Sequence, residues 1–114
     1  MRKPILTPME NFRNRVARWS RQLQAQPRTV MVMRMTRKWA SCSSRGRVCF
    51  ARDLLDLSPA LQDYVIAHEL LHMRHPNHGR VFHALLTAHV PKWRRQHARL
   101  KTIETSALTR RGDL

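Results

Sequence analysis

The sequence predicts an α+β fold of one domain, in which a helix, three short strands and three further helices follow one another along residues 1–114. Three observations lead to this prediction. Proline follows a capping residue at Thr7-Pro8 and again at Ser58-Pro59, which is typical of helix starts. The stretch between these points is rich in Val, Met and Thr and contains a hairpin signal. With 114 residues, 42% of them hydrophobic, the chain can bury one small core.

The first predicted helix begins after Thr7. The Thr7 hydroxyl can cap this helix, Pro8 suits its first turn, and Glu10 completes a capping box. Apolar residues then recur at helical spacing, at Met9, Phe12, Val16, Trp19 and Leu23. We expect the helix to end near Gln26-Pro27, because proline cannot continue a helix.

The central stretch predicts three strands, over residues 29–36, 38–42 and 47–51. The sequence between the last two strands is Ser-Ser-Arg-Gly, which is typical of a hairpin turn in which Gly46 takes a positive φ. Because side chains alternate along a strand, we interpret the spaced methionines as one buried face of the sheet. These methionines are Met31, Met33 and Met35.

Two cysteines, Cys42 and Cys49, flank the predicted hairpin. We expect them to face each other across it as reduced, half-buried thiols. Two cysteines cannot form a disulfide framework, and they cannot build a structural zinc site alone.

The second half of the chain predicts three helices. The second helix runs from Ser58-Pro59 to about Met73, and Pro76-Asn77 breaks it. A third helix carries an apolar face made of Val81, Phe82, Leu85, Leu86 and His89. Pro91 opens the last helix, and we expect a frayed tail after about Thr105.

Residues 68–72 form an HExxH motif inside the second predicted helix. The spacing of four places His68 and His72 on one helix face, one turn apart. Two imidazoles placed in this way can bind one Zn²⁺ at about 2.0–2.1 Å. Glu69 can reach a metal-bound water without being a ligand itself. The motif therefore predicts one zinc ion per chain, with Glu69 as the general base of a hydrolase.

A catalytic zinc ion requires a third protein ligand. The candidates are His75, His78, His83, His89 and Glu104. His75 follows the motif closely, but Pro76 indicates that the chain leaves the helix there. His78 lies beyond this break, where the chain can turn back toward the metal, and we favour it. Glu104 is the alternative, and we interpret the histidines of the later helices as packing or surface residues.

Two further residues are candidates for supporting the site. Tyr64 lies one helical turn before His68, so its hydroxyl can lie near the metal, although we favour a packing role for this ring. Asn77 can orient a ligand or serve as an ordinary turn residue. A peptide substrate can add as a strand to the sheet edge formed by residues 29–35 or 38–42.

The same residues resemble a known protein family. The segments 39–44 and 63–78, the latter ending in His-Pro-Asn-His, resemble the YgjP-type zinc metallopeptidases, which are relatives of the SprT-like and WLM proteases. The resemblance covers about residues 29–100. It implies a minimal zincin domain that cleaves protein or peptide substrates, with Glu69 as catalytic base. The zinc ligands that it implies are His68, His72 and His78.

The chain is strongly basic, with 22 Lys and Arg against 7 Asp and Glu and a net charge of +15. This charge exceeds what solubility requires and favours sequence-independent binding of DNA or RNA through phosphates. The candidate contacts are Arg13, Arg15, Arg18 and Arg21 on the first helix and Lys92, Arg94, Arg95, Arg99 and Lys101 on the last. Residues 53–73 contain four acidic residues and no Lys or Arg, which predicts a locally acidic catalytic segment. The resemblance points the same way, since SprT-like and WLM relatives include proteases that act on DNA-bound proteins.

The sequence also predicts a location. No stretch approaches the roughly 18 apolar residues of a membrane span, and the N-terminus lacks the apolar core of a signal peptide. We therefore expect a cytoplasmic protein without a membrane partner, while the sequence indicates no oligomeric state.

Three functions fit these features. The first is a zinc endopeptidase, acting on nucleic-acid-associated proteins. The second is a basic nucleic-acid-binding module with a structural or vestigial zinc site. The third is a zinc hydrolase of a non-peptide substrate. Glu69 favours an enzyme, because a structural zinc site has no use for a base.

Overall fold

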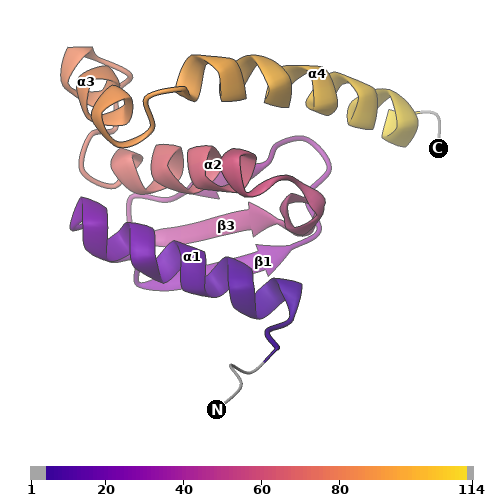
Figure 1. The fold of residues 1–114 in the computed structure, drawn as a ribbon, viewed down its shortest axis with the longest axis horizontal. Coiled ribbons are helices and arrows are strands. Elements are labelled where there is room, and N and C mark those ends of the chain that lie inside the picture. Colours follow the sequence, from indigo (N-terminus) through magenta and orange to yellow (C-terminus); the bar gives the residue numbers. More distant parts are fainter. Residues whose placement is uncertain (1–4, 113–114) are drawn as a thin grey trace.

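A computed structural model describes residues 5–112 and the side chains of residues 5–103. Over the described residues the chain folds into four α-helices and one three-stranded sheet, which confirms the α+β prediction (Figure 1). In chain order the elements are α1 (Pro8–Leu23), β1 (Thr29–Met33), β2 (Ala40–Cys42), β3 (Arg47–Ala51), the 3₁₀ turn η1 (Arg52–Asp56), α2 (Pro59–His72), α3 (Arg80–His89) and α4 (Trp93–Gly112).

Helix α1 begins as predicted. The Glu10 backbone N–H donates to the Thr7 hydroxyl at 3.1 Å, and the Thr7 N–H donates to the Glu10 carboxylate at 3.0 Å. These two bonds satisfy donors that the first turn leaves unpaired. The helix ends at Leu23, before the expected Gln26-Pro27, because Gln24 takes a left-handed conformation with φ 52° and turns the chain.

The sheet is mixed, with β3 between β1 and β2. Strands β2 and β3 form the predicted antiparallel hairpin, and Gly46 has the predicted positive φ, at 84°. Strand β1 pairs in parallel with β3, so residues 34–39 carry the chain across the sheet to its other edge. Strands β1 and β2 are both shorter than the sequence predicts, because the end of the first predicted strand and the start of the second belong to this connecting segment.

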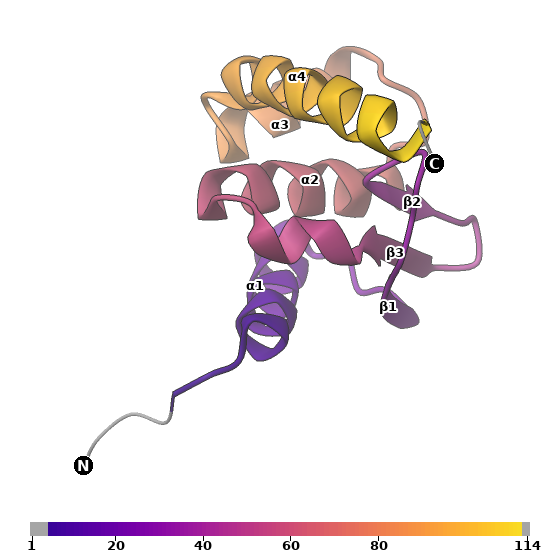
Figure 2. The same cartoon turned by 90° about the vertical axis from the view of Figure 1, so that its right-hand side faces the viewer.

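Helices α1 and α2 lie along one face of the sheet (Figure 2). Val48 and Phe50 of β3 point toward the helices and are fully buried. Met31 and Met33 lie on the other face and are 48% and 43% exposed, so the prediction of a buried methionine face is wrong. The branched Val30 and Val32 pack against the core instead.

The two cysteines lie on opposite faces of the sheet. Cys42 pairs with Val48 and therefore shares its inward face, whereas Cys49 pairs with Ser41 and lies between Val48 and Phe50 on the outward face. The expectation that Cys42 and Cys49 face each other is wrong, because they occupy adjacent register positions rather than the same one. Both thiols are free and half-buried.

Helix α2 is the central element and lies between α1 and α4 (Figures 1 and 2). Ile66, Ala67 and Leu70 on α2 are fully buried. Helix α4 continues to Gly112, past the point where the sequence predicts fraying, and no proline interrupts it. Within residues 5–112, no helix is both long and apolar enough to cross a membrane.

Candidate metal centre

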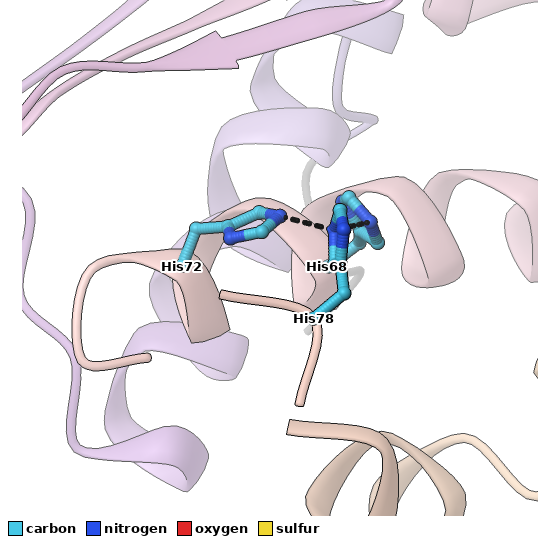
Figure 3. Close-up of side chains that lie close together, drawn as sticks. All are labelled: His68, His72 and His78. Carbon is cyan, nitrogen blue, oxygen red and sulfur yellow. Dashed lines mark hydrogen bonds between the residues drawn. The ribbon is translucent and has the colours of Figure 1, made fainter. Parts of the chain in front are cut away.

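Three histidine side chains converge where α2 ends (Figure 3). Helix α2 carries His68 and His72 one turn apart, and the segment after the helix returns His78 to them. The Nε2 atom of His78 lies 3.2 Å from Nε2 of His68 and 2.8 Å from Nε2 of His72. The three rings thus present the same type of nitrogen to one point.

These separations fit a zinc ion. Two nitrogens bound tetrahedrally to one zinc ion at about 2.0–2.1 Å lie roughly 3.3 Å apart. Three protein ligands of this kind are the set found in catalytic zinc sites, where a fourth position serves water or substrate. The residues present therefore suit the metal that the HExxH motif predicts.

The environment favours the neutral form of two of these rings. Burial, together with the neighbouring His68, lowers the pKa of His72 below its ordinary value, although Glu69 and hydrogen bonds to the backbone of His75 and Pro76 act in the opposite direction. Burial and the neighbouring histidines also lower the pKa of His78. Neutral imidazole is the form that binds a metal, so both shifts favour ligation.

The turn after α2 brings His78, rather than His75, close to His68 and His72. The N–H of His75, three residues past the end of α2, donates to the Leu71 carbonyl at 2.8 Å, so the chain still follows a helical path there. His75 then lines a separate hollow beside Leu70, Leu71 and His89. Pro76 follows, and the chain reverses so that His78 meets the motif.

The other candidates lie elsewhere. His83 stacks on Trp93, with ring centres 5.5 Å apart, and its Nδ1 lies 3.0 Å from the Gly79 carbonyl. His89 contacts Gln22 through a hydrogen bond of 3.0 Å. Glu104 lies outside the residues whose side chains the structure describes. The prediction that these histidines serve packing agrees with their contacts.

Glu69 borders the hollow beside the histidines. Its side chain is 13% exposed, and its Oε1 lies 3.4 Å from Nδ1 of His68. The hollow has a volume of about 530 Å³ and lies between α2 and the β2–β3 hairpin. Its other lining residues are Cys42, Ser43, Ser44, Gly46, His72, Met73 and Pro76. Burial and the Glu69 charge raise the pKa of Cys42, so its thiol stays protonated.

Tyr64 links the metal centre to α4. Its ring is buried, as the sequence predicts, and lies 5.8 Å from the His68 ring. Its hydroxyl lies 2.8 Å from Nδ1 of His97. Burial and the Glu69 charge raise the pKa of Tyr64 to about 12. Asn77 is exposed in the turn before His78.

Phe82 supports all three rings, and sequence reasoning treats it as a core residue alone. It is 1% exposed, and its ring centre lies 5.4 Å from His68, 4.7 Å from His72 and 4.9 Å from His78. A packed aromatic in this place limits the rotamers of the histidines. Phe82 follows His78 by four residues, and this spacing is the sequence signal for its contact with the histidines.

The predicted basic contacts separate into two groups. Helices α1 and α4 lie on opposite sides of α2, and each carries one group (Figure 1). On α1, Arg15 and Arg18 pair with Asp63 at 3.0 and 3.7 Å, and Arg13 donates to the Val30 carbonyl at 3.3 Å. The acidic Asp63 thus faces α1 rather than the metal centre.

Comparison with known protein families gives a match over most of the chain. The family model of the YgjP-like metallopeptidase domain matches residues 8–103. The chain belongs to this family. It is a metallopeptidase domain, and peptidases act on proteins or peptides.

A solved structure extends the comparison to the fold. The crystal structure of the metallopeptidase zymogen of Methanocaldococcus jannaschii jannalysin is similar to this domain, with a TM-score of 0.69 and 23% sequence identity. The match covers 82% of this chain and 95% of that one, and it shows a shared fold. The search of curated proteins found no match.

Proposed function

We propose that this YgjP-like domain is a zinc endopeptidase of the HExxH zincin type, with one zinc ion per chain held by His68, His72 and His78. The observation that supports this most is the meeting of three Nε2 atoms, at 2.8 and 3.2 Å, beside a hollow that Glu69 borders. A site of this kind combines three neutral ligands with a carboxylate that is not a ligand.

The proposed mechanism assigns a separate role to each group at the site. Zinc, when bound, supplies a Lewis acid that makes water acidic and polarises the scissile carbonyl. The Glu69 carboxylate accepts the proton of the attacking water and returns it to the leaving amine. Phe82 holds the three imidazole rings in place. Asn77 is a candidate for holding the turn that carries His78.

The β2 edge is the candidate for binding the peptide backbone. Of the two edge strands, β2 (Ala40–Cys42) supplies Cys42 to the hollow that contains Glu69 and His72. Strand β1 lies at the far edge, where Arg13 already occupies the Val30 carbonyl. An extended substrate can pair with β2 and pass over Glu69.

The test is the Glu69→Gln variant. The amide keeps the size of the side chain but cannot accept the proton, so we expect zinc content to be retained and peptide cleavage to fall by about 100-fold or more. Glu10→Gln, which changes an exposed carboxylate on α1, is the matched control and should cleave normally. Zinc-loaded wild type that cleaves no peptide or unfolded protein would favour a non-peptide hydrolase or a structural site.

The charge supports a second proposal, that the peptidase acts on proteins bound to nucleic acid. Of the two basic helices, α4 is the better candidate, because Arg15 and Arg18 on α1 are already paired with Asp63. A basic binding module with a structural or vestigial zinc site is the alternative. The two free cysteines fit a reducing compartment, and we propose a cytoplasmic location.

The salt dependence of DNA binding tests this second proposal. Arg95→Gln and Arg99→Gln together should weaken binding to a random duplex and make the dependence on salt less steep. The matched pair Arg15→Gln and Arg18→Gln on α1 should weaken DNA binding less. Equal binding by wild type and the α4 variant would contradict the assignment to α4.

A further inference from the structure

A second hollow adjoins the metal centre on the side away from the hairpin. It has a volume of about 430 Å³ and opens between α2, α3 and the start of α4. His68 and His78 form one wall, so whatever enters lies directly beside the proposed zinc site. The other lining residues are Tyr64, Phe82, His83, Leu86, Trp93, Arg94 and His97.

The walls of this second hollow are aromatic and held in place. Trp93 donates from Nε1 to the Thr87 hydroxyl at 3.0 Å and stacks against His83. The guanidinium carbon of Arg94 lies 4.6 Å from the centre of the Trp93 ring. The Tyr64 hydroxyl is engaged by His97 at 2.8 Å. A rigid apolar hollow of this size suits a large uncharged side chain, since little has to be ordered when the side chain enters.

The residues that line the second hollow carry charge of one sign only. Among the residues that the structure describes as lining it, there is no carboxylate, whereas Arg94 is a permanent cation at its rim. A lysine or arginine side chain entering here meets a like charge and finds no partner for its own, and both effects oppose its binding.

We propose that Arg94 is a specificity-determining residue, which directs the second hollow toward aromatic or large aliphatic substrate side chains and excludes basic ones. This inference rests on the proposed function, because the substrate must pass the centre formed by His68, His72 and His78. It adds a substrate class: peptides whose bond to be cleaved is flanked by an uncharged bulky residue.

The experiment compares cleavage products from an unfolded protein mixture. The zinc-loaded wild type should cut beside Phe, Leu, Met or Tyr and avoid Lys and Arg. Arg94→Gln should relax this exclusion, and Arg94→Glu should raise cleavage beside Lys and Arg by about fivefold or more relative to Phe, since a rim anion attracts the cation that Arg94 repels. Arg80→Glu makes the same charge change at an exposed position on α3 and should keep the wild-type preference.

The outcomes separate the two proposals. If zinc-loaded wild type cleaves nothing, the proposed function fails. If it cleaves but shows no preference, or if Arg80→Glu shifts the preference as much as Arg94→Glu, only the role of Arg94 is overturned. Binding of matched Phe and Lys peptides to the zinc-loaded Glu69→Gln variant, followed by fluorescence anisotropy, measures the same preference without cleavage. There too we expect the Phe peptide to bind more tightly, and equal affinity would contradict the proposal.

Discussion

The indole Nε1–H of Trp19 donates a hydrogen bond of 2.8 Å to Oδ1 of Asp63. This bond joins α1 to α2 at a partly buried position, and the same oxygen accepts from Arg15 at 3.0 Å. Helix α1 thereby holds the helix that carries His68 and His72. Asp63 belongs to the segment that the sequence predicts to be acidic around the catalytic site, but its carboxylate attaches α1 to α2 instead.

The Asp63 contacts predict a graded effect on stability. Asp63→Ala removes the acceptor of a buried indole and should lower the free energy of unfolding by about 1–3 kcal/mol. Asp63→Asn should cost less, because its amide oxygen still accepts from Trp19. Denaturant unfolding measures both. Asp56→Asn, at an exposed position, is the control and should be close to wild type. Equal losses for Ala and Asn would show that the Arg15 and Arg18 charges, rather than the indole bond, carry the effect.

Zinc content should distinguish the proposed ligands from their neighbours. His78→Ala should weaken zinc binding by at least about tenfold, because it removes one of three converging nitrogens. His75→Ala, in the separate hollow, should retain zinc, and so should Glu104→Ala. Metal analysis after dialysis against a weak chelator gives the comparison. Loss of zinc in the His75 or Glu104 variant, with His78→Ala unaffected, would reverse the ligand assignment.

The lowered pKa values of His72 and His78 predict how the stability of the metal-free protein depends on pH. Since both values lie below the ordinary 6.5, the folded state binds fewer protons than the unfolded chain just below that pH. The free energy of unfolding should therefore be at its full value above 6.5 and fall as the pH drops below it. Thermal unfolding of chelator-treated protein between about pH 5 and pH 8 measures this.

A double variant checks the origin of that pH dependence. His72→Gln with His78→Gln should flatten the decline below 6.5, whereas His89→Gln, whose ring lies against Trp19 and Gln22, should leave it unchanged. An unchanged decline in the double variant would place its origin in other groups.

Gly46 gives a fourth prediction. Its φ of 84° is unfavourable for any residue with a Cβ, and a Cβ there would lie 3.2 Å from Cγ of Arg28. Gly46→Ala should lower the free energy of unfolding by about 1–2 kcal/mol. Gly79→Ala, where a Cβ would have nothing within 4 Å, should cost less. Thermal unfolding compares the two, and similar losses would mean that the left-handed turn carries no special cost.

Several features follow from short stretches of sequence. The capping box at Thr7 and Glu10, the hairpin at Gly46 and the helical spacing of His68 and His72 depend on neighbours a few residues apart. Such neighbours meet for the same steric and hydrogen-bonding reasons in any fold that contains the element. The proline break before His78 also belongs here, because it shows that the chain turns.

Other features depend on residues far apart in the chain. The parallel pairing of β1 with β3 turned Met31 and Met33 outward, and the register of β2 separated Cys42 from Cys49. The pairing of Arg15 with Asp63 and of Tyr64 with His97 joins residues 48 and 33 positions apart. None of these partners can be chosen from local pattern.

The sequence by itself determined an α+β metallopeptidase domain with an HExxH helix, since helix caps, turns and the spacing of four act over one or two turns of chain. Only the tertiary structure decided where His78 returns, that β2 is the edge beside Glu69, and that Arg94 stands at the rim of an aromatic hollow. The physical reason is that these placements come from packing α1, α3 and α4 around α2. That packing depends on the summed burial of many distant side chains rather than on any local signal.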